Sequence, residues 1–347
     1  MEQTLVPLTP FERDIAGQPD ALRQFACSTA RGELAAILRE RYDRVIFTGM
    51  GSSHFAALPS WRQLTADGRS TWWIDTGQLL DSPRLITPAS LLVITSQSGA
   101  SGEITALFSP RGHQPVRPQA VVGITNEVGS PLARSSDAII ALHSGAEATV
   151  SAKSYLNSLA AHQQLLHMMT GDPATPGSLT DTAKLIEELN PASAAEALSR
   201  VATTASNPRI AFIGSQDHAA TALYAGLITK EAAKVAAEGF IGGEFRHGPL
   251  ELAGPGLAAV LFGAWAGDTS SAIPRLAADL TDSGADVTLV GDLVRPGART
   301  VAIPRGQTLT ELAASAVVAQ HIAVHLARAR GIEPGVFTYG RKVTTIL

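Results

Sequence analysis

Short runs of β-branched residues alternate with longer Ala- and Leu-rich stretches along this chain of 347 residues. The longer stretches carry apolar residues at helical spacing, and this alternation is typical of a parallel sheet covered by helices. The sequence therefore predicts an α/β fold. The strands are expected at residues 44–48, 72–75, 91–95, 120–125 and 138–142 in the first half, and at 209–213, 258–262, 287–290 and 300–303 in the second.

The two halves of the chain resemble each other. Phe47-Thr48-Gly49 and Phe212-Ile213-Gly214 each end a strand, lead into a small-residue helix and lie 165 residues apart. An internal duplication explains this match most simply. We place the boundary near Asn190-Pro191, so that residues 1–190 form an N-terminal domain and residues 191–347 a C-terminal domain that ends in a tail.

Two helices and one loop complete this organisation. A helical pattern over residues 180–203 is expected to bridge the halves, after a Pro/Gly-rich loop at 171–178. The final helix is expected at 308–330, because Gly331 and Pro334 are stop signals.

Composition excludes several classes of protein. The net charge is −4 and there is no long Lys/Arg run, so we expect no nucleic-acid partner. Cys27 is the one cysteine, which excludes an intramolecular disulfide and fits a reducing cytoplasm. Residues 1–10 lack the pattern of a signal peptide, and no window reaches the roughly 18 uninterrupted apolar residues of a membrane span. We therefore predict a cytoplasmic protein without a membrane partner.

A Ser/Gly-rich turn follows the expected strand at 91–95. Ser96, Ser98 and Ser101 stand where this strand passes into a helix. Backbone N–H groups and serine hydroxyls in such a turn can bind a phosphate. The alternative interpretation is a helix N-cap with small turn residues, for which serine is equally common.

A second glycine turn, Thr48 to His54, follows the first strand. It contains a G-x-G but lacks the third glycine and the later acidic residue of a dinucleotide site, so no nicotinamide cofactor is expected. Motifs of the H-E-x-x-H and G-x-S-x-G types are absent, and we predict no metal and no cofactor. Both glycine-containing turns would lie at the carboxyl ends of parallel strands, where open α/β sheets bind ligands.

Three further residues are candidates for catalysis. Glu231 ends an apolar helix pattern, so it is either a partly desolvated general base or an exposed helix-end glutamate. His247 lies between Gly243 and a Gly-Pro pair, in a loop that presents it to a cleft or holds it as a structural histidine. Lys342 is either a mobile cap over a site or a surface lysine.

Together these segments resemble the sugar isomerase (SIS) domain family, in the tandem arrangement of the isomerase half of glucosamine-fructose-6-phosphate aminotransferase. The resemblance covers nearly the whole chain. The matching segments are 11–22, 49–53, 96–99, 123–126, 130–133, 147–155, 230–231, 243–249 and Lys342. The fold that this resemblance implies is two flavodoxin-like domains, each with a five-stranded parallel sheet and helices on both faces, assembled as a homodimer.

The resemblance also implies roles for single residues. The family's phosphate loop would be Ser96, Gln97, Ser98 and Ser101. Two serines would line the sugar, namely Ser53 and Ser151. Three residues would perform the chemistry: Glu231 would move the proton between C1 and C2, His247 would open the sugar ring from across a dimer interface, and Lys342 would close the tail over the substrate.

The sequence departs from the synthases of this family at three points. No glutaminase half precedes these residues and no cysteine follows Met1, so we expect no glutaminase activity. Ile228 stands where the synthases carry a lysine, and Lys230 lies about 200° further round the helix and should not replace it. Ala100 replaces a glutamate of the phosphate loop.

The expected function is that of an enzyme acting on an aminosugar phosphate. Its most specific form is deamination of glucosamine-6-phosphate to fructose-6-phosphate and ammonia. Two alternatives within the same class are a deglycase for phosphorylated fructose-amino-acid adducts and an aldose-ketose phosphate isomerase. A non-catalytic sugar-phosphate sensing module is the alternative from another class, because SIS domains also occur in transcription regulators.

Overall fold

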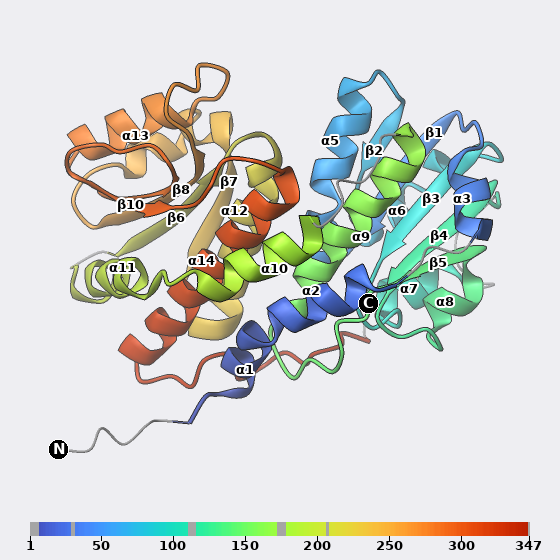
Figure 1. Ribbon diagram of the computed structural model, residues 1–347, viewed down its shortest axis with the longest axis horizontal. Helices are drawn as coiled ribbons and strands as arrows, with labels where there is room; N and C mark the ends of the chain where they lie inside the picture. Colours follow the sequence, from blue (N-terminus) through green and yellow to red (C-terminus); the bar gives the residue numbers. More distant parts are fainter. Residues whose placement is uncertain (1–6, 29–31, 110–115, 172–177, 206–207, 346–347) are drawn as a thin grey trace.

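The computed structural model describes residues 7–28, 32–109, 116–171, 178–205 and 208–345. These residues form two five-stranded parallel sheets with helices packed around them (Figure 1). The first sheet has the order β2-β1-β3-β4-β5 and the second β10-β9-β8-β6-β7. Counted from the first strand of each sheet, both orders are 2-1-3-4-5, which is a doubly wound arrangement. The predicted α/β class is confirmed.

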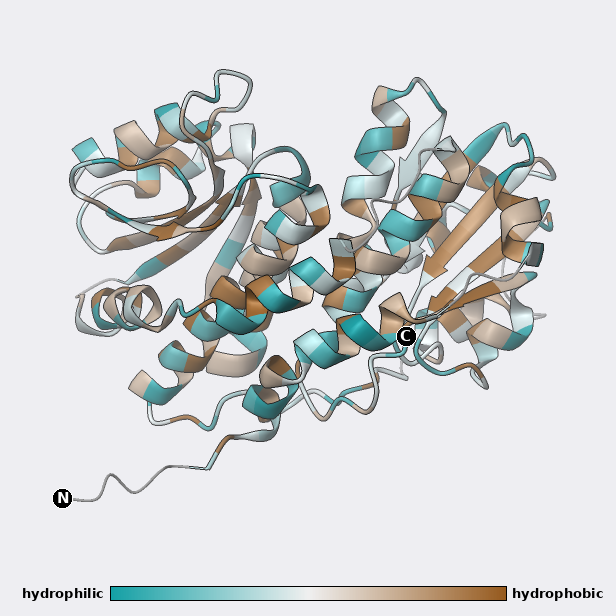
Figure 2. Cartoon of the chain, in the orientation of Figure 1, coloured by the Kyte–Doolittle hydropathy of each residue, from teal (hydrophilic) through white to brown (hydrophobic). Residues whose placement is uncertain are grey.

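Each strand predicted from the sequence overlaps an observed strand. The strands are β1 (Arg44–Gly49), β2 (Thr71–Trp73), β3 (Ser90–Thr95), β4 (Ala120–Thr125), β5 (Ala138–Ala141), β6 (Arg209–Gly214), β7 (Ala237–Ile241), β8 (Leu257–Ala264), β9 (Asp286–Gly291) and β10 (Ala298–Ala302). Every residue of β3, β4 and β8 is buried. Helices cover both faces of the sheets, so these central strands are continuously apolar rather than alternating (Figure 2).

The sequence analysis missed β7. Its middle residue is Gly239, and a Cβ there would lie only 2.3 Å from the carbonyl oxygen of Ala222. The strand therefore needs a glycine for its close approach to helix α12 (Ala219–Ala233). That glycine weakens the β-propensity on which the prediction of strands depends.

The remaining elements are helices, most of them short. They are α1 (Pro10–Ala16), α2 (Gln18–Ala26), α3 (Gly32–Leu38), α4 (Gly51–Ala56), α5 (Leu58–Ala66), α6 (Thr76–Asp81), α7 (Gly102–Leu107), α8 (Pro131–Ser135), α9 (Lys153–Thr170), α10 (Ser178–Glu188), α11 (Ala192–Thr204), α13 (Ile273–Asp282) and α14 (Thr308–Ala329), with 3-10 turns at η1 (Pro83–Leu85), η2 (Gln216–His218), η3 (Gly242–Arg246) and η4 (Pro249–Leu252).

The predicted bridging helix over residues 180–203 is wrong in one respect, because it is two helices. α10 ends at Glu188 and α11 begins at Ala192. Pro191 lies between them, and a proline disfavours helical backbone at the residue before it. α10 packs against α2 and α14, whereas α11 packs against α14 and the second sheet. Of the predicted loop at 171–178, residues 172–177 lie outside the described residues.

A layer of helices joins the two sheets. α2, α9, α10, α12 and α14 pack against one another between them (Figure 1). Their apolar side chains belong to one core cluster that takes residues from both halves of the chain. α14 begins as predicted and is the one described helix that is long and apolar enough to span a membrane, but 78% of its most apolar window is buried in this core.

Candidate active site

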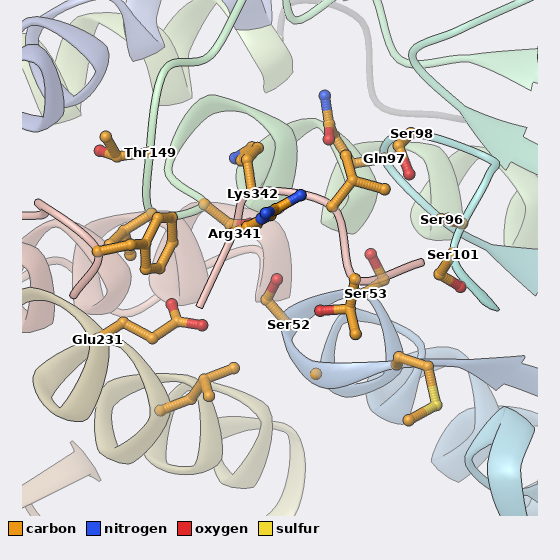
Figure 3. Close-up of a pocket in the computed structure, with 18 of the residues that line it drawn as sticks. Ser52, Ser53, Ser96, Gln97, Ser98, Ser101, Thr149, Glu231, Arg341 and Lys342 are labelled. Carbon is orange, nitrogen blue, oxygen red and sulfur yellow. The ribbon is translucent and has the colours of Figure 1, made fainter. Parts of the chain in front are cut away.

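A cavity of about 370 Å³ lies where the two halves meet. The turns after β1 and β3 form one side of it, and both turns stand at the carboxyl ends of adjacent strands, as expected. Helix α12 forms the opposite side, and the C-terminal tail passes over it (Figure 3). Eight of the nine predicted site residues line this cavity: Ser53, Ser96, Gln97, Ser98, Ser101, Ser151, Glu231 and Lys342.

The hydroxyl groups of the serine turn have free donors. The side-chain oxygens of Ser96 and Ser98 accept backbone N–H groups of the turn, and that of Ser101 accepts the Ile104 N–H of α7, at 3.1–3.4 Å. A hydroxyl has one O–H donor besides its acceptor sites. None of the three donates to another described residue, so three O–H groups can bind an anion in the cavity. Ser101 is the N-cap of α7 as well, so both interpretations of this turn are compatible with the structure.

The serine turn requires glycine at position 99. Gly99 has a φ of +59°, and a Cβ on it would lie 2.1 Å from the hydroxyl oxygen of Ser130. Only glycine avoids both the strained backbone and this overlap. The close approach of Ser130 therefore fixes the shape of the turn that presents the hydroxyl groups.

Glu231 projects from the last turn of α12 into the cavity. Leu227 lies one turn earlier on the same face and also lines the cavity. Burial raises the pKa of Glu231 to about 7, although Lys342 and Lys234 oppose this rise. Glu147 adds to the rise as a like charge. The side chain is thus not an exposed helix-end glutamate, and its pKa suits a general base near neutral pH.

The tail is held over the cavity by a buried ion pair. Lys342 Nζ lies 2.6 Å from Glu147 Oε2, and the Glu147 side chain is 0% exposed. The same carboxylate accepts the Ser154 hydroxyl at 2.6 Å and the Ala152 N–H at 2.8 Å. Because charge-assisted hydrogen bonds of this kind are strong, Glu147 fixes both the tail and the start of α9. Lys342 is therefore not a free surface lysine.

Backbone and ring contacts hold other parts of the tail. The N–H of Gly102 donates to the carbonyl of Thr344 at 2.9 Å, which joins the tail to the serine turn. Lys234 Nζ lies 5.8 Å from the centre of the Phe337 ring, and Phe337 lines the cavity. The tail is therefore tied to elements from both halves.

The sequence analysis missed two residues of this site. Glu147 was part of a matching segment but had no assigned role, since its partner Lys342 lies 195 residues away. Arg341 also lines the cavity. No local pattern singles out either residue.

Ile228, which stands where the synthases carry a lysine, does not line the cavity. Its side chain is 0% exposed within the core, and its neighbour Leu227 faces the cavity instead.

His247 does not lie in this cavity. It follows the 3-10 turn Gly242–Arg246 and is exposed. It is thus not a buried structural histidine, and its predicted role across a dimer interface is not tested by a single chain.

One histidine pair with a metal-ligand spacing was overlooked in the sequence. His321 and His325 are four residues apart on α14, which is an H-x-x-x-H pattern. Burial lowers the pKa of both side chains, and His325 contributes to this effect on His321. Within the described ranges, no third His, Cys, Asp or Glu completes a metal-binding group with them.

Comparison with known proteins identifies a domain family within the chain. Residues 37–168 match the sequence profile of the SIS domain. The chain contains a SIS domain. The glutamine–fructose-6-phosphate aminotransferase of Pyrococcus horikoshii is 30% identical over 261 residues, which cover 72% of this chain and 42% of that protein. The SIS-domain chain is thus homologous to the isomerase domain of these aminotransferases and spans about half the length of the curated relatives it matches.

Solved structures share the fold over almost the whole SIS-domain chain. The C-terminal domain of glucosamine-fructose-6-phosphate aminotransferase from Francisella tularensis has a TM-score of 0.77 at 16% identity, covering 96% of this chain and 99% of that one. Glucosamine-6-phosphate deaminase from Thermotoga maritima has a TM-score of 0.71 at 21% identity, covering 97% of this chain and 100% of that one. Tagatose-6-phosphate ketose/aldose isomerase from Escherichia coli has a TM-score of 0.77 at 21% identity, covering 95% of this chain and 96% of that one.

Proposed function

We propose that this chain is an enzyme that deaminates glucosamine-6-phosphate to fructose-6-phosphate and ammonia. One observation carries the proposal. The cavity places a carboxyl group with a pKa of about 7, Glu231, opposite a turn with three unused serine O–H donors. A phosphorylated sugar needs both features, an anchor for its anion and a base for its reactive carbons.

The serine turn would anchor the substrate. The hydroxyls of Ser96, Ser98 and Ser101 would donate to the phosphate oxygens, and Gln97 lines the same cavity (Figure 3). Ser53 and Ser151 also line the cavity and would contact the sugar hydroxyls. Such anchoring at one end orients C1 and C2 toward the base.

Glu231 would move the proton. With the ring open, its carboxylate takes the proton from C2 of the aminosugar, which produces an enolamine. The same proton returns to C1, and the resulting imine at C2 adds water and releases ammonia. A pKa near neutrality suits both steps, because the group must act first as a base and then as an acid. Lys342, held by Glu147, would close the tail and exclude bulk water.

A homodimer would complete the site. His247 is exposed and lies outside the cavity of its own chain, so we assign it the opening of the sugar ring in the neighbouring subunit. We also propose a domain boundary near Asn190-Pro191. The shared 2-1-3-4-5 order supports two flavodoxin-like domains, 1–190 and 191–347, from a duplicated unit. A cytoplasmic location fits these assignments.

The second candidate is a different reaction in the same cavity. A deglycase for phosphorylated fructose-amino-acid adducts or an aldose-ketose isomerase would use the same base and the same phosphate anchor. The solved structures that share the fold include a deaminase and a ketose/aldose isomerase. A sensing module is disfavoured, because ligand binding alone does not need a desolvated carboxyl group at C1 and C2.

The decisive experiment measures both products at once. Purified protein is incubated with glucosamine-6-phosphate, and ammonia and fructose-6-phosphate are followed together. Equal release of the two products, absent from Glu231→Gln, supports the deaminase. If the protein turns over only a fructosamine phosphate or an unaminated ketose phosphate, the deaminase proposal is wrong and the second candidate function takes its place. Binding without turnover of any of these substrates would favour a sensor.

A mixing experiment tests the role of His247. Glu231→Gln and His247→Ala are each expected to be inactive. If each site takes Glu231 from one subunit and His247 from the other, subunit exchange creates dimers with one intact site, and about a quarter of wild-type activity returns at random pairing. Activity that stays absent after verified exchange would refute the shared site.

A further inference from the structure

We propose that Arg341 supplies the positive charge of the phosphate site. This proposal rests on the proposed function, because it takes the serine turn as the place where the substrate phosphate binds. The turn itself provides hydroxyl donors and no cation. A phosphate that carries two negative charges is held more strongly where a guanidinium faces it, since arginine can donate two parallel N–H bonds to its oxygens.

The Arg341 side chain is available for a ligand. It lines the cavity and is exposed. Glu103 and Glu231 are the carboxylates that line the same cavity, and neither forms an ion pair with Arg341. No other described residue pairs with its guanidinium. In Figure 3 the side chain extends from the tail toward the side of the view where Ser96 and Ser98 lie.

The neighbouring cation cannot take this role. Lys342 Nζ is already bound to the fully buried carboxylate of Glu147 at 2.6 Å. Its charge is thus compensated within the protein, and moving it to a phosphate would leave Glu147 buried without its partner, which is costly. Arg341 is therefore the cation of the described cavity lining whose charge is not compensated.

The tail connects Arg341 to the serine turn. The carbonyl of Thr344 is bonded to Gly102 N–H at 2.9 Å, directly after Ser101. Arg341 is three residues before Thr344, so its Cα lies at most about 11 Å from that of Thr344. A long arginine side chain spans much of this distance. Bound phosphate would then connect the turn to the tail, and so help to hold Lys342 over the substrate.

The test uses inorganic phosphate as the probe and titration calorimetry as the readout. Arg341→Gln is expected to weaken phosphate binding by about 10- to 100-fold, and Arg341→Lys by less, because lysine keeps the charge but not the paired donors. Arg330→Gln is the matched control, since Arg330 is an exposed arginine at the end of α14 and lies outside the cavity lining. Thermal unfolding without phosphate should be the same in all variants, which verifies folding.

The outcomes separate this inference from the proposed function. Weaker binding by Arg341→Gln, with Arg330→Gln equal to wild type, supports it. Equal phosphate binding by wild type and Arg341→Gln overturns it and leaves the serine turn as the site. Absence of phosphate binding in wild type overturns both the site and the role of Arg341. Arginine-dependent phosphate binding without turnover of any sugar phosphate supports the inference and overturns the proposed reaction alone.

Discussion

Replacing Glu231 with glutamine is expected to abolish turnover and, at alkaline pH, to make the protein more stable. The two effects have one cause. Burial raises the pKa of this carboxyl group from 4.5 to about 7, so the folded protein disfavours its ionised form. Glutamine has almost the same shape and carries no charge. The variant therefore loses the base and, with it, the cost of keeping a charge in a partly desolvated position.

The size of the stability effect follows from the pKa shift. Each pKa unit corresponds to about 1.4 kcal/mol, so a rise from 4.5 to about 7 corresponds to at most about 3.5 kcal/mol. Below pH 4.5 the carboxyl group is protonated in both folded and unfolded protein, and it contributes no penalty. Between pH 4.5 and 7 the unfolded chain ionises first, so the free energy of unfolding falls as pH rises. Above pH 7 the penalty is complete and constant.

Urea unfolding at pH 4.5, 6 and 8 measures this difference directly. The free energy of unfolding of Glu231→Gln should exceed that of wild type by little at pH 4.5 and by between about 1 and 3 kcal/mol at pH 8. Glu188→Gln is the control, because the Glu188 side chain is 67% exposed and should show no such growth. A gap that is independent of pH, or a wild type that is the more stable protein at pH 8, would refute the assignment of a desolvated carboxyl group. In wild type, kcat/KM should rise with pH through about 7 as the base ionises.

Three other substitutions test the geometry of the cavity. Glu147→Gln should free Lys342, lower kcat/KM by about 100-fold and speed tryptic cleavage of the tail, and an unchanged cleavage rate would contradict the ion pair as the tail's anchor. Gly99→Ala should destabilise the protein by about 2–4 kcal/mol in chemical unfolding, owing to its positive φ and the overlap with Ser130, whereas a loss below about 0.5 kcal/mol would show that the turn can relax. Ser98→Ala should raise KM for the sugar phosphate by about 10-fold with little change in kcat, and a loss confined to kcat would argue against a phosphate contact.

The strands and the serine turn could be predicted because they depend on neighbouring residues. β-branched runs and small residues in turns reflect local backbone preferences, which are readable in a window of about ten residues. β7 was not predicted, because the glycine that its packing requires, Gly239, has a low intrinsic preference for strands. The break between α10 and α11 was marked by Pro191, and the periodicity on either side concealed it.

The site could be predicted in part. Its serines and Glu231 stand beside turns and helix ends that have recognisable patterns, and the family resemblance assigned their roles. Glu147 and Arg341 carry no such signal. Their significance depends on the tail crossing the cavity, and on a partner for Glu147 that is 195 residues distant.

The sequence by itself determined that this chain is α/β, where all of its described strands but β7 lie, and which turn offers hydroxyl groups to an anion. These are consequences of local hydrophobic periodicity and turn chemistry. Only the tertiary structure decided that Glu231 has a pKa of about 7, that Glu147 holds Lys342 and that Arg341 faces the cavity without a partner among the described residues. Burial and charge neighbours are set by how two halves of a chain pack together, and such packing joins residues that the sequence keeps far apart.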